Sequence, residues 1–178
     1  MKPSRFLALG LLASAPVLAA ATSPDQYLDL RTRERAVSIR VTEDNLSGPQ
    51  LQLYFGDDVV RGRAFGRPVN LKVEDDTVKG VYGQGPVDLK VTEEGDMLEA
   101  VGTFGGQLSN FRVSPDQIAG NIGRCSYELV TKSKSKDLYT GWRTCGGRLD
   151  NAVTLSIPPE LADDDAGLVT ALSIVLAQ

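Results

Sequence analysis

A short phrase built around one glycine recurs along the middle of this chain, from about residue 59 to residue 158. The recurring glycines are Gly62, Gly80, Gly102, Gly120 and Gly141. Their spacings of 18, 22, 18 and 21 residues are too short for a repeat of two helices, and they suit two short strands with two turns. Each copy is therefore predicted to be a β-hairpin.

The second segment of each copy alternates apolar and polar residues. Residues 69–73 read Val-Asn-Leu-Lys-Val, and residues 87–91 read Val-Asp-Leu-Lys-Val. Because successive side chains of a strand point to opposite faces, this pattern indicates one buried face and one hydrated face. The links at 74–77, 92–96 and 114–117 are acidic and rich in turn-forming residues, which is typical of exposed hairpin loops.

Two more alternating segments, 36–41 and 51–55, precede the repeats, and we expect them to form a hairpin around a turn at 45–49. The total is about twelve short strands with no long helical crossover between them. The fold is therefore predicted to be all-β, with antiparallel hairpin repeats that form a meander barrel or a sandwich.

The segment after Pro159 has a different apolar period. It begins with Asp163, Asp164 and Asp165, which suit the N-terminus of a helix. The apolar residues that follow have a helical spacing: Leu168, Val169, Leu172, Val175 and Leu176. We predict a short C-terminal helix over about 164–177 that packs one apolar stripe on the sheet, covering an opening or the glycine row. A terminal strand is the alternative.

The first residues have the order of a secretory signal peptide. Lys2 and Arg5 precede an apolar run over 6–18, and small alanines follow at 19–21. The expected organisation is a signal peptide over 1–21 and a single domain over 22–178, secreted or periplasmic. We expect no transmembrane segment in the mature chain, because the apolar run is too short and the predicted strands carry Lys or Arg on their exposed face.

Export to an oxidising compartment makes a disulfide the expected state of the two cysteines, Cys125 and Cys145. A loop of this length stabilises a fold by about 3 kcal/mol in the chain-entropy treatment. A redox-active pair is the alternative, but the close spacing of a Cys-x-x-Cys motif is missing.

Composition excludes several classes of chemistry. The chain has no histidine, two cysteines and no block of like charge, which argues against most zinc sites, histidine-based triads and polybasic arms. Cleavage of 1–21 leaves 17 basic and 23 acidic residues, a balance that argues against nucleic acid as a partner. The paired carboxylates lie in predicted turns rather than a pocket. We therefore expect no enzyme, no metal and no cofactor.

Two surfaces are candidates for binding. The recurring glycines favour a structural role, in which they let the sheet bend or let another layer approach closely. The alternative is that the glycine row and its apolar neighbours form a shallow trough for a flat or chain-like ligand. The trough residues would be Gly80, Tyr82, Gly102, Phe104, Gly120 and Ile122. Alternatively, Lys72, Lys90 and Arg112 could form a cationic ladder for an acidic polysaccharide or a protein, or simply a solvated face.

These features favour an exported, disulfide-stabilised, non-enzymatic β-repeat protein. It would act as a structural or macromolecule-binding module of the cell envelope, with a protein or polysaccharide as its partner. The alternative is a carrier barrel for a small apolar ligand. A filled core favours the first function, whereas an apolar cavity of several hundred cubic ångströms favours the second.

Overall fold

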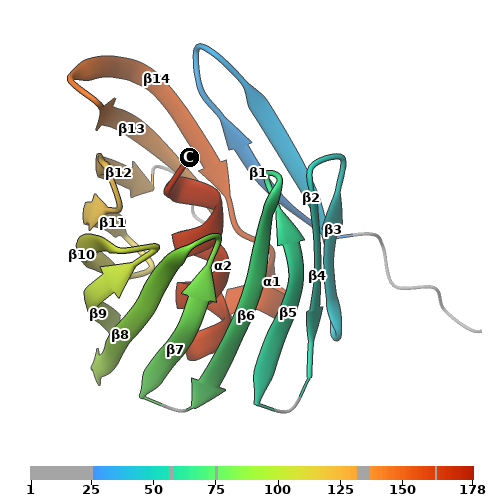
Figure 1. The fold of residues 1–178 in the computed structure, drawn as a ribbon. Helices are drawn as coiled ribbons and strands as arrows, with labels where there is room; N and C mark the ends of the chain where they lie inside the picture. The colour runs from blue at the N-terminus through green and yellow to red at the C-terminus, as the bar shows by residue number, and fades with distance from the viewer. Residues whose placement is uncertain (1–25, 57, 75, 132–136, 163) are drawn as a thin grey trace, which may run out of the picture.

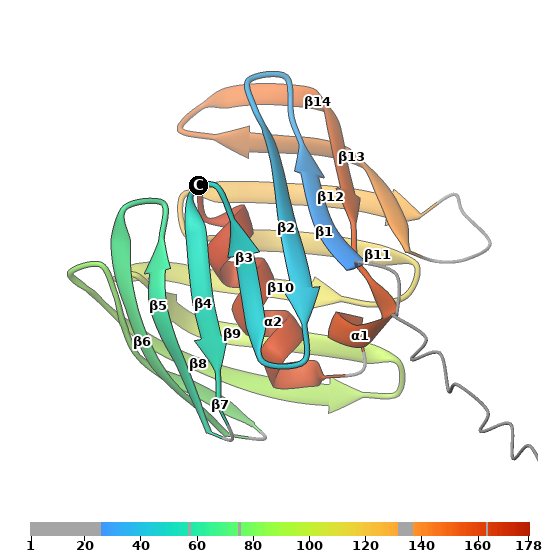
Figure 2. The same ribbon diagram turned by 90° about the vertical axis from the view of Figure 1, so that its right-hand side faces the viewer.

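The computed structural model describes residues 26–56, 58–74, 76–131, 137–162 and 164–178, so the predicted signal peptide over 1–21 lies outside the described residues. Within these ranges fourteen antiparallel strands close into one barrel (Figures 1 and 2). The strands are β1 Gln26–Arg31, β2 Ala36–Thr42, β3 Asn45–Gly48, β4 Leu51–Phe55, β5 Val59–Ala64, β6 Arg67–Glu74, β7 Thr77–Tyr82, β8 Gly85–Glu94, β9 Met97–Phe104, β10 Gln107–Val113, β11 Gln117–Ile122, β12 Cys125–Thr131, β13 Leu138–Cys145 and β14 Arg148–Ser156.

The predicted all-β meander is confirmed, and its closure is that of a barrel. Each strand pairs with its neighbours in sequence, and the first strand pairs with the last. At this closure Leu30 lies opposite Leu155, and Arg31 lies opposite Thr154. The ladder therefore has no open edge, which removes the row of unpaired backbone groups that an open sheet would expose.

The prediction of about twelve strands is wrong by two. Residues 45–48 were expected to be a turn, but they form β3, in which Leu46 is buried opposite Val41 and Leu53. A four-residue strand with one buried side chain is too short to display an alternating pattern. The other additional strand is β1, in which Leu28 and Leu30 are buried.

The C-terminal helix is confirmed, and it lies inside the barrel. After the short helix α1 (Pro159–Ala162), helix α2 (Asp165–Leu176) runs through the lumen with strands on all sides (Figures 1 and 2). Every residue from Ala166 to Leu176 is buried. The expectation of one apolar stripe packed on the sheet is therefore wrong, because a helix inside a barrel is enclosed around its whole circumference.

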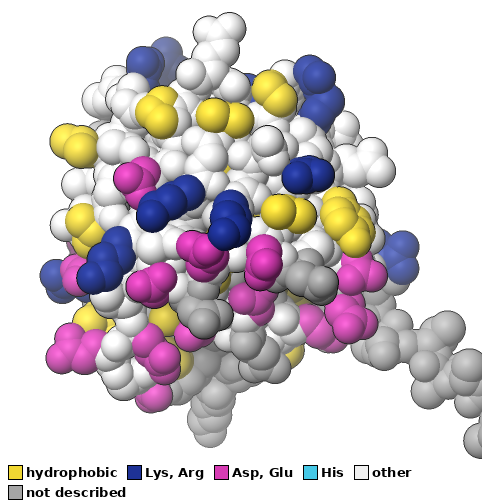
Figure 3. All heavy atoms as spheres, turned by 60° about the horizontal axis from the view of Figure 1, so that its bottom comes forward, with side chains coloured by type: hydrophobic (Ala, Val, Ile, Leu, Met, Phe, Trp, Pro, Cys, Tyr) yellow, Lys and Arg dark blue, Asp and Glu magenta, His cyan; other side chains and the backbone are white. Residues whose placement is uncertain are grey.

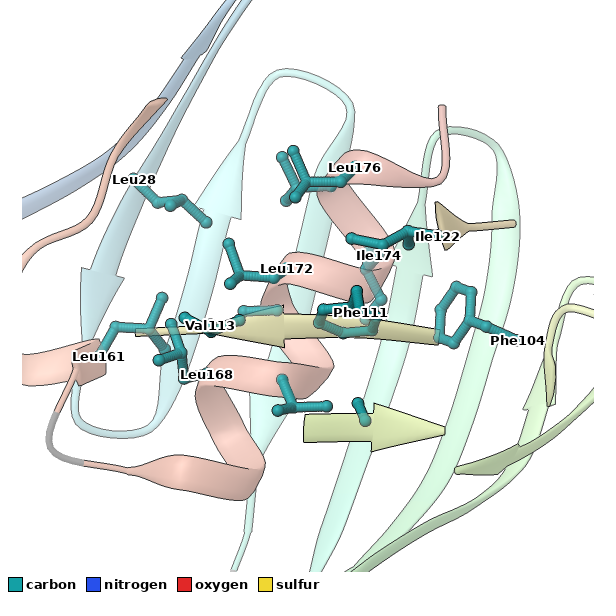
Figure 4. Close-up of a cluster of buried hydrophobic side chains, with 14 of the residues drawn as sticks. Leu28, Phe104, Phe111, Val113, Ile122, Leu161, Leu168, Leu172, Ile174 and Leu176 are labelled. Atoms are coloured by element: carbon teal, nitrogen blue, oxygen red, sulfur yellow. The ribbon is translucent and has the colours of Figure 1, made fainter. Parts of the chain in front are cut away.

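The helix and the inner face of the barrel form one hydrophobic core. Phe104, Phe111 and Ile122 point from β9, β10 and β11 toward α2, as Figure 4 shows. Leu168, Leu172, Ile174 and Leu176 fill the space between α2 and the walls (Figure 4). The lumen is thus occupied by side chains of the chain itself.

Both ends of α2 are held by specific hydrogen bonds. Asp164 is the N-cap, and its Oδ1 accepts the backbone N–H of Gly167 at 2.9 Å. At the other end, Tyr127 Oη donates to the carbonyl of Leu176 at 2.7 Å, which satisfies one of the last helical carbonyls. Gln178 Nε2 donates to the carbonyl of Ile174 at 3.0 Å and to Tyr82 Oη at 2.6 Å.

One face of α2 carries two fully buried hydroxyl groups, those of Thr170 and Ser173. Neither hydroxyl has a hydrogen-bond partner among the described protein atoms. A buried, unsatisfied hydroxyl costs about 1–3 kcal/mol. We expect Thr170→Val to raise the free energy of unfolding by about 1 kcal/mol or more, because valine has nearly the same shape and no polar atom. Urea denaturation measures the change. A lower midpoint than that of the wild type would contradict this expectation.

The recurring glycines are required by the backbone of the wall. Gly80 and Gly102 have extended backbones with φ of 144° and 150°, which L-residues rarely adopt. A Cβ at these positions would lie 2.2 Å from the carbonyl oxygen of Asn70 and 2.0 Å from that of Asp88, on the neighbouring strands. Glycine kinks allow a sheet to curve and close, which supports the bending role of the row.

Candidate functional site

Arginines are concentrated at one end of the barrel, where the two-residue turns 65–66, 83–84, 105–106, 123–124 and 146–147 lie. We call it the arginine end. Eight of the eleven arginines that the structure describes belong to it: Arg31, Arg33, Arg35, Arg63, Arg67, Arg124, Arg143 and Arg148. Its acidic residues, within the described part of the chain, are Glu34 and Asp150.

The opposite end is acidic and surrounds the N-terminus of α2. Its carboxylates lie in or beside the turns that follow β2, β4, β6, β8 and β10, directly before β13, and in the segments around α1 and α2 (Figure 3). They are Glu43, Asp44, Asp58, Glu74, Asp76, Glu93, Glu94, Asp96, Asp116, Asp137, Glu160, Asp164 and Asp165. Over the described ranges, no group of three or more Cys, Asp or Glu side chains is arranged to hold a metal ion.

An open cavity of about 640 Å³ lies at the arginine end. Its side-chain walls are Arg67, Tyr82, Gln84, Phe104, Gln107 and Arg124, and glycines of the turns form much of the remainder. Ligand pockets are typically 300–1,000 Å³ in volume, so the cavity is large enough for a ligand.

The predicted trough residues are divided between the cavity and the wall. Tyr82 and Phe104 line the cavity. Ile122 is fully buried beside α2 (Figure 4). Gly80, Gly102 and Gly120 lie further along the strands, where the nearest atoms to an added Cβ belong to adjacent strands. The structure thus places two of the six residues in the lining of the cavity, and both of their side chains are buried.

Tyr82 connects the cavity to the core. The Arg67 guanidinium carbon lies 5.4 Å from the centroid of the Tyr82 ring, within the range of a cation–π contact. The Tyr82 and Phe104 ring centroids are 5.0 Å apart. Burial raises the pKa of Tyr82, so its phenol stays protonated near neutral pH. These contacts fix the floor of the cavity.

A buried ion pair also lies at the arginine end. Arg143 and Asp150 are both buried, with Arg143 Nε 4.0 Å from Asp150 Oδ2. Asp150 also accepts the backbone N–H groups of Arg33 at 2.8 Å and Ala152 at 3.0 Å. These backbone hydrogen bonds, with the charge of Arg143, hold the pKa of Asp150 below its ordinary value. Asp150 therefore ties the loop between β1 and β2 to β14.

The pKa shift of Asp150 predicts an acid-dependent loss of stability. Because its folded pKa is depressed, its contribution is present above the ordinary carboxyl range and is lost as pH falls through the folded pKa. We expect the free energy of unfolding to fall more steeply in the wild type than in Asp150→Asn as the pH is lowered from about 5 to about 3, with equal slopes above this range. Urea midpoints measured across this range provide the comparison.

The control for this prediction is Glu34→Gln, which removes an exposed carboxylate from the same end and tests for a general effect of charge. Equal pH slopes in the wild type and Asp150→Asn would show that Asp150 does not contribute to the acid sensitivity.

Lys72, Lys90 and Arg112 lie on the outer wall, away from the cavity, and all three are exposed. Lys72 pairs with Glu74, and Arg112 Nε lies 3.1 Å from Glu99 Oε1. Sequence reasoning missed the arginine end because its cations come from four hairpins that are far apart in the sequence. The sequence did contain a signal, which is the position of these arginines. Most of them lie within two residues of a turn, and these turns all lie at the same end of the predicted hairpins.

The disulfide prediction is confirmed, since Cys125 and Cys145 are bonded across β12 and β13, directly opposite one another. The bond also lies at the arginine end, where Cys125 Sγ is 3.6 Å from the carbonyl oxygen of Gln178. It thus joins two strands beside the C-terminal end of α2.

The fold and site define a closed antiparallel meander barrel with a helix through its lumen and an arginine-lined cavity at one end. Comparisons with protein-family models, curated proteins and solved structures found no significant match to this chain. Among the described residues, helices that are long and apolar enough to cross a membrane are absent.

Proposed function

We propose that the chain is an exported, non-enzymatic module of the cell envelope that binds a macromolecule, a protein or a polysaccharide, at its arginine end. The observation that carries this proposal is the position of α2. Because the helix and its side chains fill the lumen, the barrel has to bind its partner from outside. The arginine end offers an open cavity of about 640 Å³ for that contact. It also has more cationic hydrogen-bond donors than carboxylates.

The polar groups of the cavity support binding rather than catalysis. Arginine guanidinium groups remain charged at all ordinary pH values, and glutamine amides do not titrate. The phenol of Tyr82, whose pKa is raised, stays protonated. General acid–base catalysis requires a group that exchanges protons near the working pH, and these groups instead provide fixed hydrogen-bond donors and acceptors.

A carrier of a small apolar ligand is the second candidate, and one feature favours it. A cavity of about 430 Å³ at the acidic end is partly lined by Leu98, Val113, Ile157 and Leu168. It is open to solvent, and Glu93, Asp96, Asp137 and Asp165 also line it. Carrier sites bury most of the surface of their ligand, so an open cavity that is also lined by carboxylates does not suit a small apolar ligand.

Native mass spectrometry of the purified protein tests the choice between these functions. We expect the mass of the polypeptide alone, because the lumen is occupied by α2. A stoichiometric apolar molecule that co-purifies and is removed by organic extraction would overturn the proposal in favour of the carrier.

The same sample tests export. The disulfide supports an oxidising compartment. We expect the mature chain to begin within a residue or two of Thr22 and to gain no alkyl label before reduction. A chain that retains residues 1–21 after expression with an active secretion pathway would contradict export.

A further inference from the structure

The rim of the arginine end is a row of short turns with few side chains. The turns 65–66, 83–84, 105–106 and 123–124 follow one another along the wall, and each contains at least one glycine. The exposed polar side chains that line the cavity are those of Arg67, Gln84, Gln107 and Arg124, beside the small ring of Pro68. A chain-like molecule can therefore lie across the turns without a steric barrier.

The order of these four side chains suits an extended ligand. Two amides lie between two guanidinium groups along the rim, from β6 to the turn before β12. Neighbouring strands lie about 4.8 Å apart, so the row measures roughly 25 Å along the curved wall. A polymer with repeated anionic groups can contact both arginines and both glutamines in one passage.

The arginine end has more positive charge than its own carboxylates neutralise. Arg148 pairs with Glu34, and Asp150 is already committed to Arg143 and to two backbone amides. Neither Arg67 nor Arg124 forms an ion pair with any residue that the structure describes. Repulsion among clustered cations opposes the folded state, and an anionic ligand would relieve it.

Arg35 shows the same crowding. It is half-buried in the loop between β1 and β2, and its pKa is lowered by burial and by the charge of Arg143. The additional positive charge near the C-terminal end of α2 strengthens the attraction for an anion at the neighbouring cavity.

We infer that the arginine end binds an acidic polysaccharide, with sugar carboxylates on Arg67 and Arg124 and sugar hydroxyls on Gln84 and Gln107. This inference rests on the proposed function. Guanidinium groups match carboxylates in a bidentate geometry. Glutamine amides both donate and accept hydrogen bonds, as sugar hydroxyls do, whereas a purely ionic site would need donors alone. The acidic opposite end disfavours polymers as densely charged as nucleic acids.

The test measures binding of the full mature chain to polygalacturonate, with neutral dextran and polyglutamate as comparison polymers. We expect binding to polygalacturonate that weakens with salt, and none to dextran. The double variant Arg67→Gln, Arg124→Gln should weaken binding by about tenfold or more, because each arginine makes a charge-assisted hydrogen bond. The control, Arg61→Gln with Lys79→Gln, removes the same charge from exposed positions on the outer wall and should change affinity by less than about threefold.

The glutamines distinguish a sugar from charge alone. Gln84→Ala with Gln107→Ala should weaken binding to polygalacturonate by about fivefold or more. If polyglutamate binds as tightly as polygalacturonate, or if the control pair loses as much affinity as the arginine pair, the inference is wrong.

Two outcomes separate this inference from the proposed function. Absence of polygalacturonate binding, together with a native mass free of small molecules, would overturn the polysaccharide assignment and leave the binding-module proposal standing. Sedimentation tests the second outcome, in which the protein self-associates. If the double variant Arg67→Gln, Arg124→Gln abolishes this self-association, the arginine end binds the acidic end of a second copy. That result would also overturn the assignment of a polysaccharide ligand.

Discussion

A chain that ends at Pro159 is expected to show no cooperative unfolding transition and to bind a hydrophobic dye. The truncation removes α2 and exposes the side chains that face it, such as Phe104, Phe111 and Ile122. Burial of one large apolar side chain is worth about 1.5–3 kcal/mol, and a whole domain has a net stability of about 5–15 kcal/mol. Helix α2 contributes six large apolar side chains, from three leucines, one isoleucine and two valines, and their loss therefore exceeds the stability available.

Point variants of Leu172 separate loss of the core from loss of chain length. Leu172→Asp places a charge at a fully buried position and should abolish folding, whereas Leu172→Met keeps the volume and should cost less than about 1.5 kcal/mol. Thermal unfolding followed by circular dichroism measures both. A truncated chain that remains soluble, monomeric and as stable as the parent would show that α2 does not complete the core.

The second large effect is expected at the glycine row. Gly80→Ala and Gly102→Ala should each lower the free energy of unfolding by about 3 kcal/mol or more. The new methyl group would overlap a carbonyl oxygen of the adjacent strand, and the residue would also have to keep a φ of 144° or 150°. The wall must either shift or lose a ladder hydrogen bond. Chemical denaturation gives the change directly.

Gly95→Ala is the matched control. Gly95 has a positive φ of 62°, but an added Cβ meets no atom within 4 Å. This substitution should cost only the strain of the left-handed conformation, about 1–2 kcal/mol. Equal losses at Gly95 and Gly102 would mean that φ alone accounts for the effect and that the close approach of the strands is unimportant.

The glycine spacing and the alternating segments were sufficient to predict the barrel, because both reflect local rules of strand geometry. Residues 69–73 and 87–91 have the period of a half-buried strand wherever they are placed. The disulfide was predictable for a similar reason: with two cysteines in the chain, one intramolecular bond is available. The C-terminal helix followed from its apolar period.

The location of α2 was not predictable from that period. Leu168, Leu172 and Val175 are compatible with packing on a sheet, and the deciding residues are Ala171, Thr170 and Ser173 on the remaining faces. Small or weakly polar side chains are common on exposed helix faces too, so their burial becomes evident only once the barrel surrounds them. The predicted ligand trough along the glycine row does not coincide with the cavity at the arginine end, for a related reason. The register of adjacent strands, which the sequence does not display, places the glycines against the backbone of a neighbouring strand.

The pairing of β1 with β14 constrains the time course of folding. A ribosome delivers the strands one by one, and each hairpin can pair with the one before it. The first strand nevertheless waits for residues 154–156, and the inner face of the wall waits for α2, which is made last. Closure therefore requires contacts across nearly the whole sequence, a topology that folds slowly. Until α2 and β14 are in place, the partly formed wall has a free edge and an apolar surface, so the chain is in greatest need of a chaperone before this last segment joins the fold.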